Sequence, residues 1–461
     1  MVAALRAAEL GARTTLVTRD SFGGMAANDG PVPVRALAHA ARLIRETRQL
    51  NQYGIEVGEP ALDYARLLRR VAEVVGQVRT HSLMRRNLEE AGVRIHEHTG
   101  SARFVDPYHI QCERGSTFEA ERIILCSGGK NRELPVPGSE LTVNHSHAWS
   151  LTAVPPSMIV VGAGATGVQV ASVFKALGAQ VQLFEAGPRI LKTEDEDVSA
   201  AMVAALRASD IVVHESFGTI QRFDNGPAGV RMVYTRDSQE MSTSAAAVVV
   251  AIGWQADTAG LNLAAAGVQT NQRGYVKVDE YLRTTAPHVF AAGDVNGRLM
   301  LVPQATHEGY LAAINAVRGP TQPIPDQVCP VGSFTDPEYA QVGLTETNAR
   351  AKHAEVVVSR VPYDELPRPV IDGRPFGFCK LIVDRVSHQI VGCHIVGERA
   401  VEIAQLAAVA MAARTTVDVL VQVPLSFPTY TNVLGRAVLN AAYQLNPGGI
   451  LDTAELAHTA A

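Results

Sequence analysis

Short runs of apolar residues that lead into glycine recur along the chain and predict buried strands. The clearest is residues 158–161 (Met-Ile-Val-Val), which precedes a glycine-rich turn and an alanine-rich helix that continues to Leu177. Residues 123–125 (Ile-Ile-Leu) and 248–250 (Val-Val-Val) are similar runs, each followed closely by glycine. Strands that are apolar throughout and alternate with helices are typical of a parallel sheet covered on both faces, so the pattern predicts an α/β fold.

Two segments of the chain resemble each other. Residues 10–17 (LGARTTLV) and 177–184 (LGAQVQLF) each follow an alanine-rich helical stretch, and Gly11 and Gly178 are 178 − 11 = 167 positions apart. The repeat predicts two Rossmann-like units in tandem. With this offset, the counterpart of Gly167 falls just before the first residue. We therefore expect the first strand and glycine motif of the first unit to lie upstream, either because the start codon is assigned too late or because the unit is truncated.

The glycine-rich turn of the second unit has the spacing of a dinucleotide-binding motif. Residues 162–167 read Gly-Ala-Gly-Ala-Thr-Gly. Gly162 permits a tight turn, Gly164 lets the backbone approach a pyrophosphate, and Gly167 lets the helix pack closely on the strand. The N–H groups at the start of that helix then face the pyrophosphate.

The residue at the end of the next strand indicates which dinucleotide binds. Residues 181–184 form this predicted strand, and Glu185 follows it, 185 − 162 = 23 positions after the first glycine of the turn. A carboxylate at this place accepts hydrogen bonds from the adenosine ribose and repels a 2′-phosphate, which favours NAD over NADP. Arg189 lies close enough in sequence to weaken that preference, so NADP stays possible.

Length and charge exclude several classes of function. The 461 residues correspond to about three domains. The formal net charge of −5 and the pI near 6.3 give no polybasic signal, so we expect no nucleic-acid partner. No apolar run approaches the ~18 residues of a membrane span, and no membrane insertion is expected. The N-terminal residues have neither the order of a secretory signal nor that of a transit peptide, which favours a cytoplasmic protein.

The cysteines and histidines do not predict a metal site. The five cysteines show neither a CxxC pair nor a metal-ligand spacing, and we expect reduced, buried thiols: Cys112, Cys126, Cys329, Cys379 and Cys393. His145 and His147 are spaced like a ligand pair, but acids and cysteines do not cluster around them, so a loop is expected instead.

Residues 21–37 (SFGGMAANDGPVPVRAL) resemble the GGTCxNxGCxPSKAL segment of the pyridine nucleotide–disulfide oxidoreductases. That family includes dihydrolipoamide dehydrogenase, glutathione reductase, mercuric reductase and the soluble transhydrogenase. The resemblance continues through four further segments: 124–129 (ILCSGG), 251–258 (AIGWQADT), 284–295 (TTAPHVFAAGDV) and 334–346 (FTDPEYAQVGLTE). It covers the chain from Met1 to about Leu445.

The resemblance implies an α/β fold with two Rossmann-like dinucleotide-binding domains and a C-terminal α+β dimerisation domain. The FAD domain is expected to be discontinuous, over residues 1–153 and 276–325, with its first strand and GxGxxG missing. The NAD domain is expected over 154–275 and the dimerisation domain over 326–461. The implied assembly is a homodimer.

The same resemblance implies the residues that bind each cofactor. For FAD these are Gly23, Gly24, Met25, Arg35, Ser127, Gly128, Gly129, Gly293, Asp294, Val302 and Gln304. For NAD they are Gly162, Gly164, Ala165, Thr166, Gly167, Glu185 and Gly253. The helix expected after Leu301 would point its N-terminal N–H groups at the flavin.

Several positions depart from the family pattern. The two redox cysteines correspond to Ala26 and Pro31, and neither side chain can act as a thiolate. Proline also removes an N–H, so this helix turn is expected to be reshaped. Phe427 and Asn432 stand in place of the His and Glu of the family's HPTxxE segment. Both halves of the thiol machinery are absent together, which argues against a disulfide reductase mechanism.

Two further family positions bear on catalysis. The lysine beside the flavin corresponds to Arg35, and its glutamate partner corresponds to Gln169. Arg35 stays cationic and can still stabilise a reduced flavin. Arg35 and Tyr430 are the candidate catalytic residues.

These observations favour an FAD-dependent oxidoreductase that takes a hydride from NAD(P)H onto FAD and passes the electrons directly to a small-molecule acceptor. The expected acceptor is a quinone, a dye or a second nicotinamide. Two alternatives stay open. One is a catalytically silent, dimeric NAD-binding scaffold. The other is an enzyme like dihydrolipoamide dehydrogenase or mercuric reductase that uses other thiols, with Cys379 and Cys393, both expected on strands, as candidates.

Overall fold

The computed structural model describes residues 1–80, 83–325 and 328–447. The chain divides into two compact units. The first comprises residues 1–135, 142–154 and 249–327, and the second comprises 136–141, 155–248 and 328–461. The three-domain division expected from the sequence stays a prediction.

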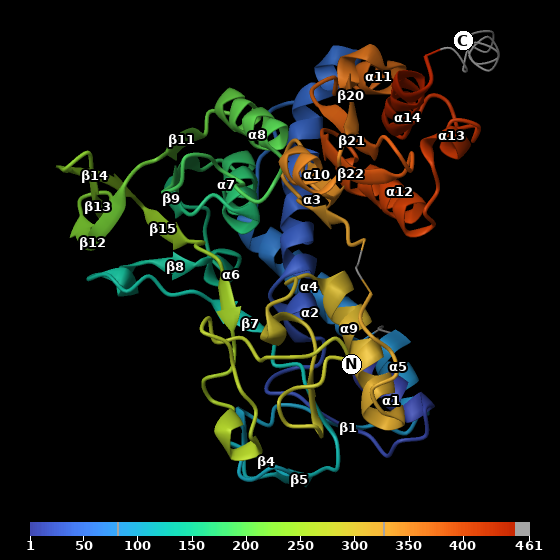
Figure 1. Ribbon diagram of the computed structural model, residues 1–461. Helices are drawn as coiled ribbons and strands as arrows, with labels where there is room; N and C mark the ends of the chain where they lie inside the picture. Colours follow the sequence, from blue (N-terminus) through green and yellow to red (C-terminus); the bar gives the residue numbers. More distant parts are fainter. Residues whose placement is uncertain (81–82, 326–327, 448–461) are drawn as a thin grey trace. The chain divides into compact units, whose positions relative to one another are not determined.

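The first unit combines helices with short strand pairs. Its helices are α1 (Val2–Glu9), α2 (Gly24–Asn28), α3 (Pro31–Gln49), α4 (Tyr64–Thr80), α5 (Leu83–Glu90), α6 (His145–Ala148) and α9 (Val302–Arg318). Its strands are β1 (Thr15–Val17), β2 (Arg94–His96), β3 (Ala102–Phe104), β4 (His109–Cys112), β5 (Thr117–Glu119), β6 (Ile123–Leu125), β7 (Gly129–Asn131), β8 (Val143–Asn144), β16 (Trp254–Ala256) and β17 (Val289–Ala291). Figure 1 traces these elements in blue, cyan and yellow.

Two parallel pairs, β1–β2 and β6–β17, carry the α/β character of this unit. β17 is buried at every position, as expected for an apolar strand covered on both faces. The long helix α9 packs against α1 through small side chains: Ala3, Ala7 and Ala313 share one cluster, and Gly309 lies beside Ala3. A short antiparallel sheet, β3–β4–β5, and the pair β7–β16 complete the unit.

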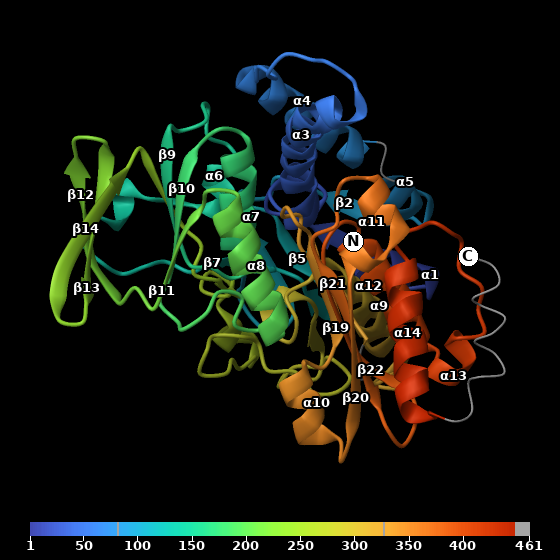
Figure 2. The same ribbon diagram turned by 90° about the horizontal axis from the view of Figure 1, so that it is seen from above.

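The first part of the second unit is a βαβ unit. The apolar residues of β9 (Ser157–Val161) are buried, and β9 pairs in parallel with β10 (Gln180–Glu185) through the crossover helix α7 (Ala165–Ala176). Helix α8 (Glu196–Ala208) leads to β11 (Val212–Glu215), which pairs with β10, again in parallel. Figure 2 shows α7 and α8 beside these strands. The elements expected here from the sequence are therefore confirmed.

An antiparallel sheet follows, formed by β12 (Thr219–Gly226), β13 (Gly229–Arg236) and β14 (Gln239–Ala245). Strand β15 (Ala247–Val250) follows. Its last two residues, Val249 and Val250, belong to the first unit and pair there in parallel with β8. The strand expected at residues 248–250 is confirmed.

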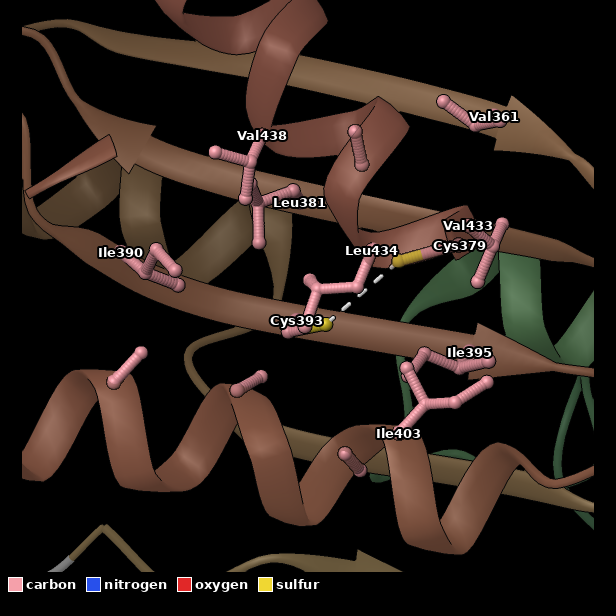
Figure 3. Packing of buried hydrophobic residues seen from close by; sticks show 14 of the residues in the cluster. Val361, Cys379, Leu381, Ile390, Cys393, Ile395, Ile403, Val433, Leu434 and Val438 are labelled. Atoms are coloured by element: carbon pink, nitrogen blue, oxygen red, sulfur yellow. Dashed lines mark hydrogen bonds between the residues drawn. The ribbon is translucent and has the colours of Figure 1, made fainter. Parts of the chain in front are cut away.

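The C-terminal part is an antiparallel sheet in the order β18-β19-β22-β21-β20. Its strands are β18 (Val331–Gly332), β19 (Tyr339–Gly343), β20 (Val356–Pro362), β21 (Phe378–Asp384) and β22 (Ile390–Val396). The helices of this part are α10 (Glu346–Lys352), α11 (Pro367–Ile371), α12 (Ala400–Ala412), α13 (Val417–Leu420) and α14 (Asn432–Leu445). Residues of α12 and α14 share one apolar core with β21 and β22 (Figure 3).

The cysteines are all free. Cys379 and Cys393 are buried in that core with their sulfur atoms 3.9 Å apart (Figure 3), on strands as the sequence predicted. Cys126 is exposed. The expectation of a buried thiol was wrong here, since Cys126 lies just beyond the last residue of β6, Leu125. Cys329 is only half-buried.

Candidate functional site

The glycine-rich turn of the second unit is held in place by a carboxylate. Gly162 directly follows β9 and has φ +95°, a backbone conformation that residues with a side chain rarely adopt. Glu185, at the end of β10, accepts hydrogen bonds through both oxygens, from the N–H of Ala163 at 2.9 Å and from the N–H of Gly187 at 2.8 Å. Each carboxylate oxygen still has a second lone pair for a ligand hydroxyl. The turn and the acidic residue therefore lie together, as the motif predicted.

Helix α7 starts directly after this turn. Gly164 is its extended N-cap and is exposed, as is Ala165, while Gly167 is buried against the strands. Thr166 is half-buried, and the first turn of the helix carries no acidic side chain. Free N–H groups and the positive end of the helix dipole suit the pyrophosphate of a dinucleotide.

Gly253, the other expected NAD residue, belongs to the first unit. It has φ +106°, and its carbonyl accepts a hydrogen bond from the N–H of Arg132 at 3.0 Å. Its role toward NAD stays a prediction.

In the first unit, Gly293 and Asp294 follow β17 and are organised by a buried glutamate that the sequence analysis gave no role. Glu308 on α9 is completely buried. Its Oε2 accepts from the Gly293 N–H and from Asn296 Nδ2, both at 2.7 Å, and its Oε1 accepts from Gln304 Nε2 at 2.7 Å. Through these hydrogen bonds Glu308 holds the turn at Gly293 and the first turn of α9 together.

The backbone at this turn requires glycine. Gly293 has φ +78° and ψ −154°, and a Cβ built there would lie 3.0 Å from the Cβ of Ala305. The N–H of Gly293 is taken by Glu308, and the residue that follows, Asp294, begins a short 3-10 turn.

Two side chains beside the turn could receive hydroxyl groups of a ligand. Gln304 is buried, and its Oε1 has no hydrogen-bond partner within the described residues. Burial, together with the negative charge of Glu308, raises the pKa of the Asp294 carboxyl. A buried acceptor without a donor is costly, so these residues fit a hydroxyl-rich group such as the sugar chain of FAD. Val302, the first residue of α9, is exposed.

The other expected FAD residues lie on two further segments of the first unit. Gly128 has φ +75°, and Ser127 beside it is exposed. Gly129 starts β7, where a Cβ would lie 3.0 Å from Met300 Cε and 3.1 Å from the carbonyl oxygen of Gln255. A side chain here would need its neighbours to shift by a few tenths of an ångström, so close packing favours glycine.

The α2–α3 segment keeps the backbone of the family motif without its thiols. Gly23 has φ +111°, and a Cβ there would lie 2.8 Å from the Cβ of Ala27. Gly24 has φ +60°, and Met25 beside it is half-buried. Pro31 opens α3 at the first helical position, which suits a residue that lacks an N–H.

The proline thus divides the segment into two helices, with α2 ending at Asn28 and α3 beginning at Pro31. Arg35 lies on an exposed position of α3, one turn further on. Its role as a catalytic residue stays a prediction.

At the C-terminal end, Phe427 and Tyr430 occupy different environments. The Phe427 side chain is 67% exposed. Tyr430 is buried, and its hydroxyl donates to Asp372 Oδ2 at 3.0 Å. Burial and this carboxylate raise the pKa of Tyr430, so the phenol stays protonated at neutral pH. Asn432 Oδ1 accepts from the Thr429 N–H at 2.8 Å and so stabilises the start of α14.

His145 and His147 lie in helix α6, so the expected loop was wrong. Asn144 caps this helix by accepting from the His147 N–H at 2.9 Å. His145 is buried against the Trp254 ring at 4.6 Å, and burial lowers its pKa to about 4. Within the described residues, no group of three or more His, Cys, Asp or Glu side chains could hold a metal ion.

The chain belongs to the pyridine nucleotide-disulphide oxidoreductase family, a family of FAD-dependent oxidoreductases. The family model matches residues 1–309, and the model of the family's dimerisation domain matches residues 329–438. No helix in the described part of the chain has the length and apolar character needed to cross a membrane.

Several curated relatives span nearly the whole chain. The dihydrolipoyl dehydrogenase of Zymomonas mobilis is 30% identical over 452 residues, which cover 96% of this chain and 95% of that protein. Dihydrolipoyl dehydrogenase 2 of Haloarcula marismortui is 34% identical and covers 87% of this chain and 86% of its own length. The mercuric reductase of Bacillus cereus is 28% identical, covering 95% of this chain and 69% of that protein.

Among solved structures, the HOCl-induced flavoprotein disulfide reductase RclA from Escherichia coli has the same fold. It matches with a TM-score of 0.83 at 24% identity and covers 95% of this chain and 96% of its own. The α/β fold and the C-terminal dimerisation domain expected from the sequence are confirmed.

Proposed function

We propose that this protein is an FAD-dependent oxidoreductase that oxidises NADH and passes electrons from the flavin directly to a small-molecule acceptor, without a dithiol relay. One observation supports the proposal: the chain keeps the residues expected to contact the nicotinamide dinucleotide and, apart from the missing GxGxxG motif of the FAD domain, those expected to contact the flavin. The positions of the family's redox chemistry, in contrast, carry Ala26, Pro31 and Phe427. None of these three side chains can be oxidised to a disulfide or transfer a proton.

The flavin would be held in the first unit. Asp294 and Gln304 would accept hydrogen bonds from its hydroxyl-bearing chain, and the glycines at 23–24, 128–129 and 293 would let the backbone approach it. Bound FAD supplies a two-electron acceptor for the nicotinamide hydride, and the protein supplies orientation and charge. The N-terminus of α9 and the Arg35 guanidinium would favour the negative charge of the reduced cofactor.

The nicotinamide dinucleotide would be held in the second unit, with its pyrophosphate on the N-terminus of α7. Glu185 would accept from the adenosine ribose hydroxyls, which favours NAD. The exposed apolar side chain of Phe427 and the absence of a titrating imidazole at that position favour an acceptor that needs no acid from the protein, such as a quinone or a dye. Arg35 and Tyr430 stay the candidates for catalysis. The Tyr430 hydroxyl donates its one proton to Asp372, so toward a ligand it would act as a hydrogen-bond acceptor.

The proposed assembly is a homodimer formed through the C-terminal domain, in keeping with the match to the family's dimerisation domain. The silent scaffold is the second candidate, and the same replacements favour it. An enzyme that uses Cys379 and Cys393 is less well supported, because both thiols lie buried in an apolar core. The hydrogen bond with Cys393, together with burial, raises the pKa of Cys379 well above its ordinary value.

The absorbance of the purified protein separates these candidates. We expect a yellow protein whose flavin band disappears when NADH is added without oxygen and returns when a benzoquinone is added. A colourless protein that cannot be loaded with FAD, yet binds NADH, would leave only the scaffold. A yellow protein whose flavin is not reduced by NADH would contradict the proposed reaction.

A further inference from the structure

The loop that follows Glu185 is held directly on the glycine-rich turn. Residues 186–195 connect β10 to α8. The Leu191 N–H donates to the Ala163 carbonyl at 2.9 Å, on the same residue whose N–H is bound by Glu185. The loop therefore lies against the turn of the proposed dinucleotide site, and the position of its side chains bears on which dinucleotide fits.

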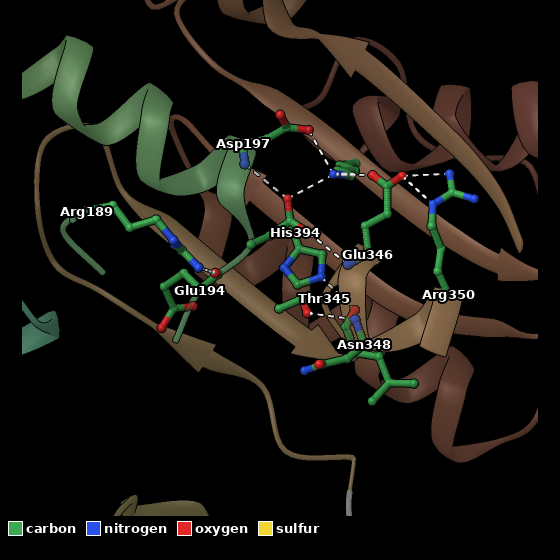
Figure 4. Close-up of polar contacts among 11 residues, drawn as sticks. Arg189, Glu194, Asp197, Thr345, Glu346, Asn348, Arg350 and His394 are labelled. Carbon is green, nitrogen blue, oxygen red and sulfur yellow. Dashed lines mark hydrogen bonds and ion pairs between the residues drawn. The ribbon is translucent and has the colours of Figure 1, made fainter. Parts of the chain in front are cut away.

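Arg189 is the basic residue of this loop nearest to Glu185 in sequence, and its guanidinium is turned back onto the loop itself. Nη1 donates to the carbonyl oxygen of Leu191 at 3.1 Å. Nη2 donates to the carbonyl oxygens of Lys192 at 2.9 Å and Glu194 at 3.1 Å. Figure 4 shows Arg189 directed toward Glu194. A planar guanidinium that binds three carbonyls holds the loop in a single shape.

The loop carbonyls that accept from Arg189 lie in a part of the loop with an unfavourable backbone conformation. Leu191 has φ +48°, in the left-handed region that a branched residue rarely adopts. Its side chain is buried, and Ser199 Oγ donates to the neighbouring carbonyl of Ile190 at 2.7 Å. The loop is thus strained at one residue and held there by contacts on both sides.

The far end of the loop is fixed by buried charges. Asp195 is the N-cap of α8, and Lys380 Nζ donates to its Oδ1 at 2.9 Å while the Glu346 N–H donates to its Oδ2 at 2.9 Å. Lys380 also pairs with Asp197 at 2.8 Å and Glu346 at 2.6 Å. With this end fixed, Arg189 can turn toward a ligand only by releasing its three carbonyls.

We propose that Arg189 is a positioning residue that holds the loop, and that it does not bind a 2′-phosphate. The Arg189 guanidinium, bound to the loop, then does not offset the charge of Glu185, and the site selects dinucleotides that lack the 2′-phosphate. This inference rests on the proposed function, because it concerns the same nicotinamide dinucleotide site. If Arg189 is bound to the loop in this way, its presence near Glu185 is no longer a reason to expect binding of NADP.

The test compares two ligands that cannot be oxidised or reduced: ADP-ribose and 2′-phospho-ADP-ribose. Their dissociation constants are measured by calorimetry on the FAD-loaded full chain, for the natural protein, Arg189→Leu and Arg189→Lys. Hydrogen exchange at the amides of residues 190–194 is measured on the same samples. The lysine variant keeps the positive charge but cannot reach three carbonyls at once.

We expect the natural protein to bind ADP-ribose at least about tenfold more tightly than the 2′-phosphorylated ligand. In both variants we expect loop exchange to rise about tenfold or more. Both ligands should weaken by the same factor, about threefold, so that the ratio of their dissociation constants stays within about twofold of its original value.

Three results would overturn the inference. In the first, Arg189→Leu weakens only the 2′-phosphorylated ligand, and Arg189→Lys preserves its binding, which would make Arg189 a phosphate ligand. In the second, exchange and affinity are unchanged in both variants, which would remove its role in holding the loop. In the third, the natural protein binds neither ligand, which would overturn the proposed dinucleotide site itself and this inference with it.

Discussion

The glycine-rich turn of the second unit and the α2–α3 segment of the first are built alike but differ in what they have kept. Each places left-handed glycines at the start of a helix, Gly162 before α7 and Gly23 at the start of α2. The first keeps Glu185, the side chain expected to contact its ligand. The second carries Ala26 and Pro31 where the family's motif has cysteines.

The backbone that holds a dinucleotide and the side chains that relay electrons are therefore independent features of the fold. Glycines at 162 and 23 are demanded by backbone conformation and close packing, so they persist whatever chemistry follows. A thiol at position 26 or 31 is demanded only by the relay. Membership of the family is therefore compatible with a protein that holds its cofactors without reducing disulfides.

The largest effect is expected from Glu308→Ala, which would disrupt the turn at Gly293 that is proposed to hold the flavin. The substitution leaves the Gly293 N–H and the amides of Asn296 and Gln304 buried without their acceptor. We expect the free energy of unfolding to fall by about 3 kcal/mol or more and bound FAD to be lost. Urea unfolding and the flavin content of the purified protein measure both.

Arg318→Ala, at the exposed end of the same helix, is the matched control and should change neither quantity. If Glu308→Ala retained its flavin at the stability of the natural protein, Glu308 would not organise this turn.

The next effect concerns pH and the loop beside the NAD turn. Burial raises the pKa of Glu194 to about 7 from an ordinary 4.5, so ionising this side chain costs the folded state. Below pH 4.5 the carboxyl is protonated whether folded or unfolded and has no effect. As the pH rises through 7 the cost reaches its full value, at most about 3 kcal/mol.

Glu194→Gln should therefore stabilise the protein at pH 8 but not at pH 4. Urea unfolding across that range measures the difference from the natural protein, and Glu196→Gln, at an exposed position, is the control. A stabilisation that does not change with pH would show that the Glu194 carboxyl ionises as freely in the folded protein as in the unfolded one.

A smaller effect is expected from Glu185→Ala, which tests whether ligand binding at the glycine-rich turn of the second unit depends on the Glu185 carboxylate. Loss of the acceptor for the Ala163 and Gly187 N–H groups and for the ribose should weaken ADP-ribose about ten- to a hundredfold. Calorimetry measures this, and Glu185→Gln should lose less because it keeps one acceptor oxygen. Unchanged affinity in the alanine variant would place the ribose elsewhere.

The smallest effect on activity is expected from replacing Cys379 and Cys393 together by alanine. Turnover of NADH with a quinone acceptor should be unchanged, since the proposed route uses no thiol. The two small cavities should lower the free energy of unfolding by about 1–2 kcal/mol. Loss of turnover in a variant that still binds FAD would return the buried thiols to the mechanism.

The sequence predicted well wherever a local pattern determines the structure. The strand–turn–helix around Gly162 begins and ends within a residue or two of its expected limits, because an apolar run, three glycines and an alanine-rich helix all indicate the same βαβ unit. The strands that hold Cys379 and Cys393 were also foreseen.

Contacts between residues distant in sequence could not be predicted in this way. Glu308 looks like an ordinary helical glutamate, and only the folded chain brings Gly293 and Asn296 to it. Lys380 donates a hydrogen bond to Asp195, although the two residues are 185 positions apart in sequence. The carbonyl contacts of Arg189 are close in sequence, yet they depend on the left-handed turn at Leu191, which no residue type there signals.

Anaerobic titration of the FAD-loaded protein with NADH tests the central claim most directly. A flavin and a disulfide each take up two electrons, so the number of NADH equivalents consumed reveals whether a second redox group is present. The absence of a thiol relay predicts complete reduction at about one equivalent of NADH per FAD. Consumption of about two equivalents before reduction is complete would contradict it.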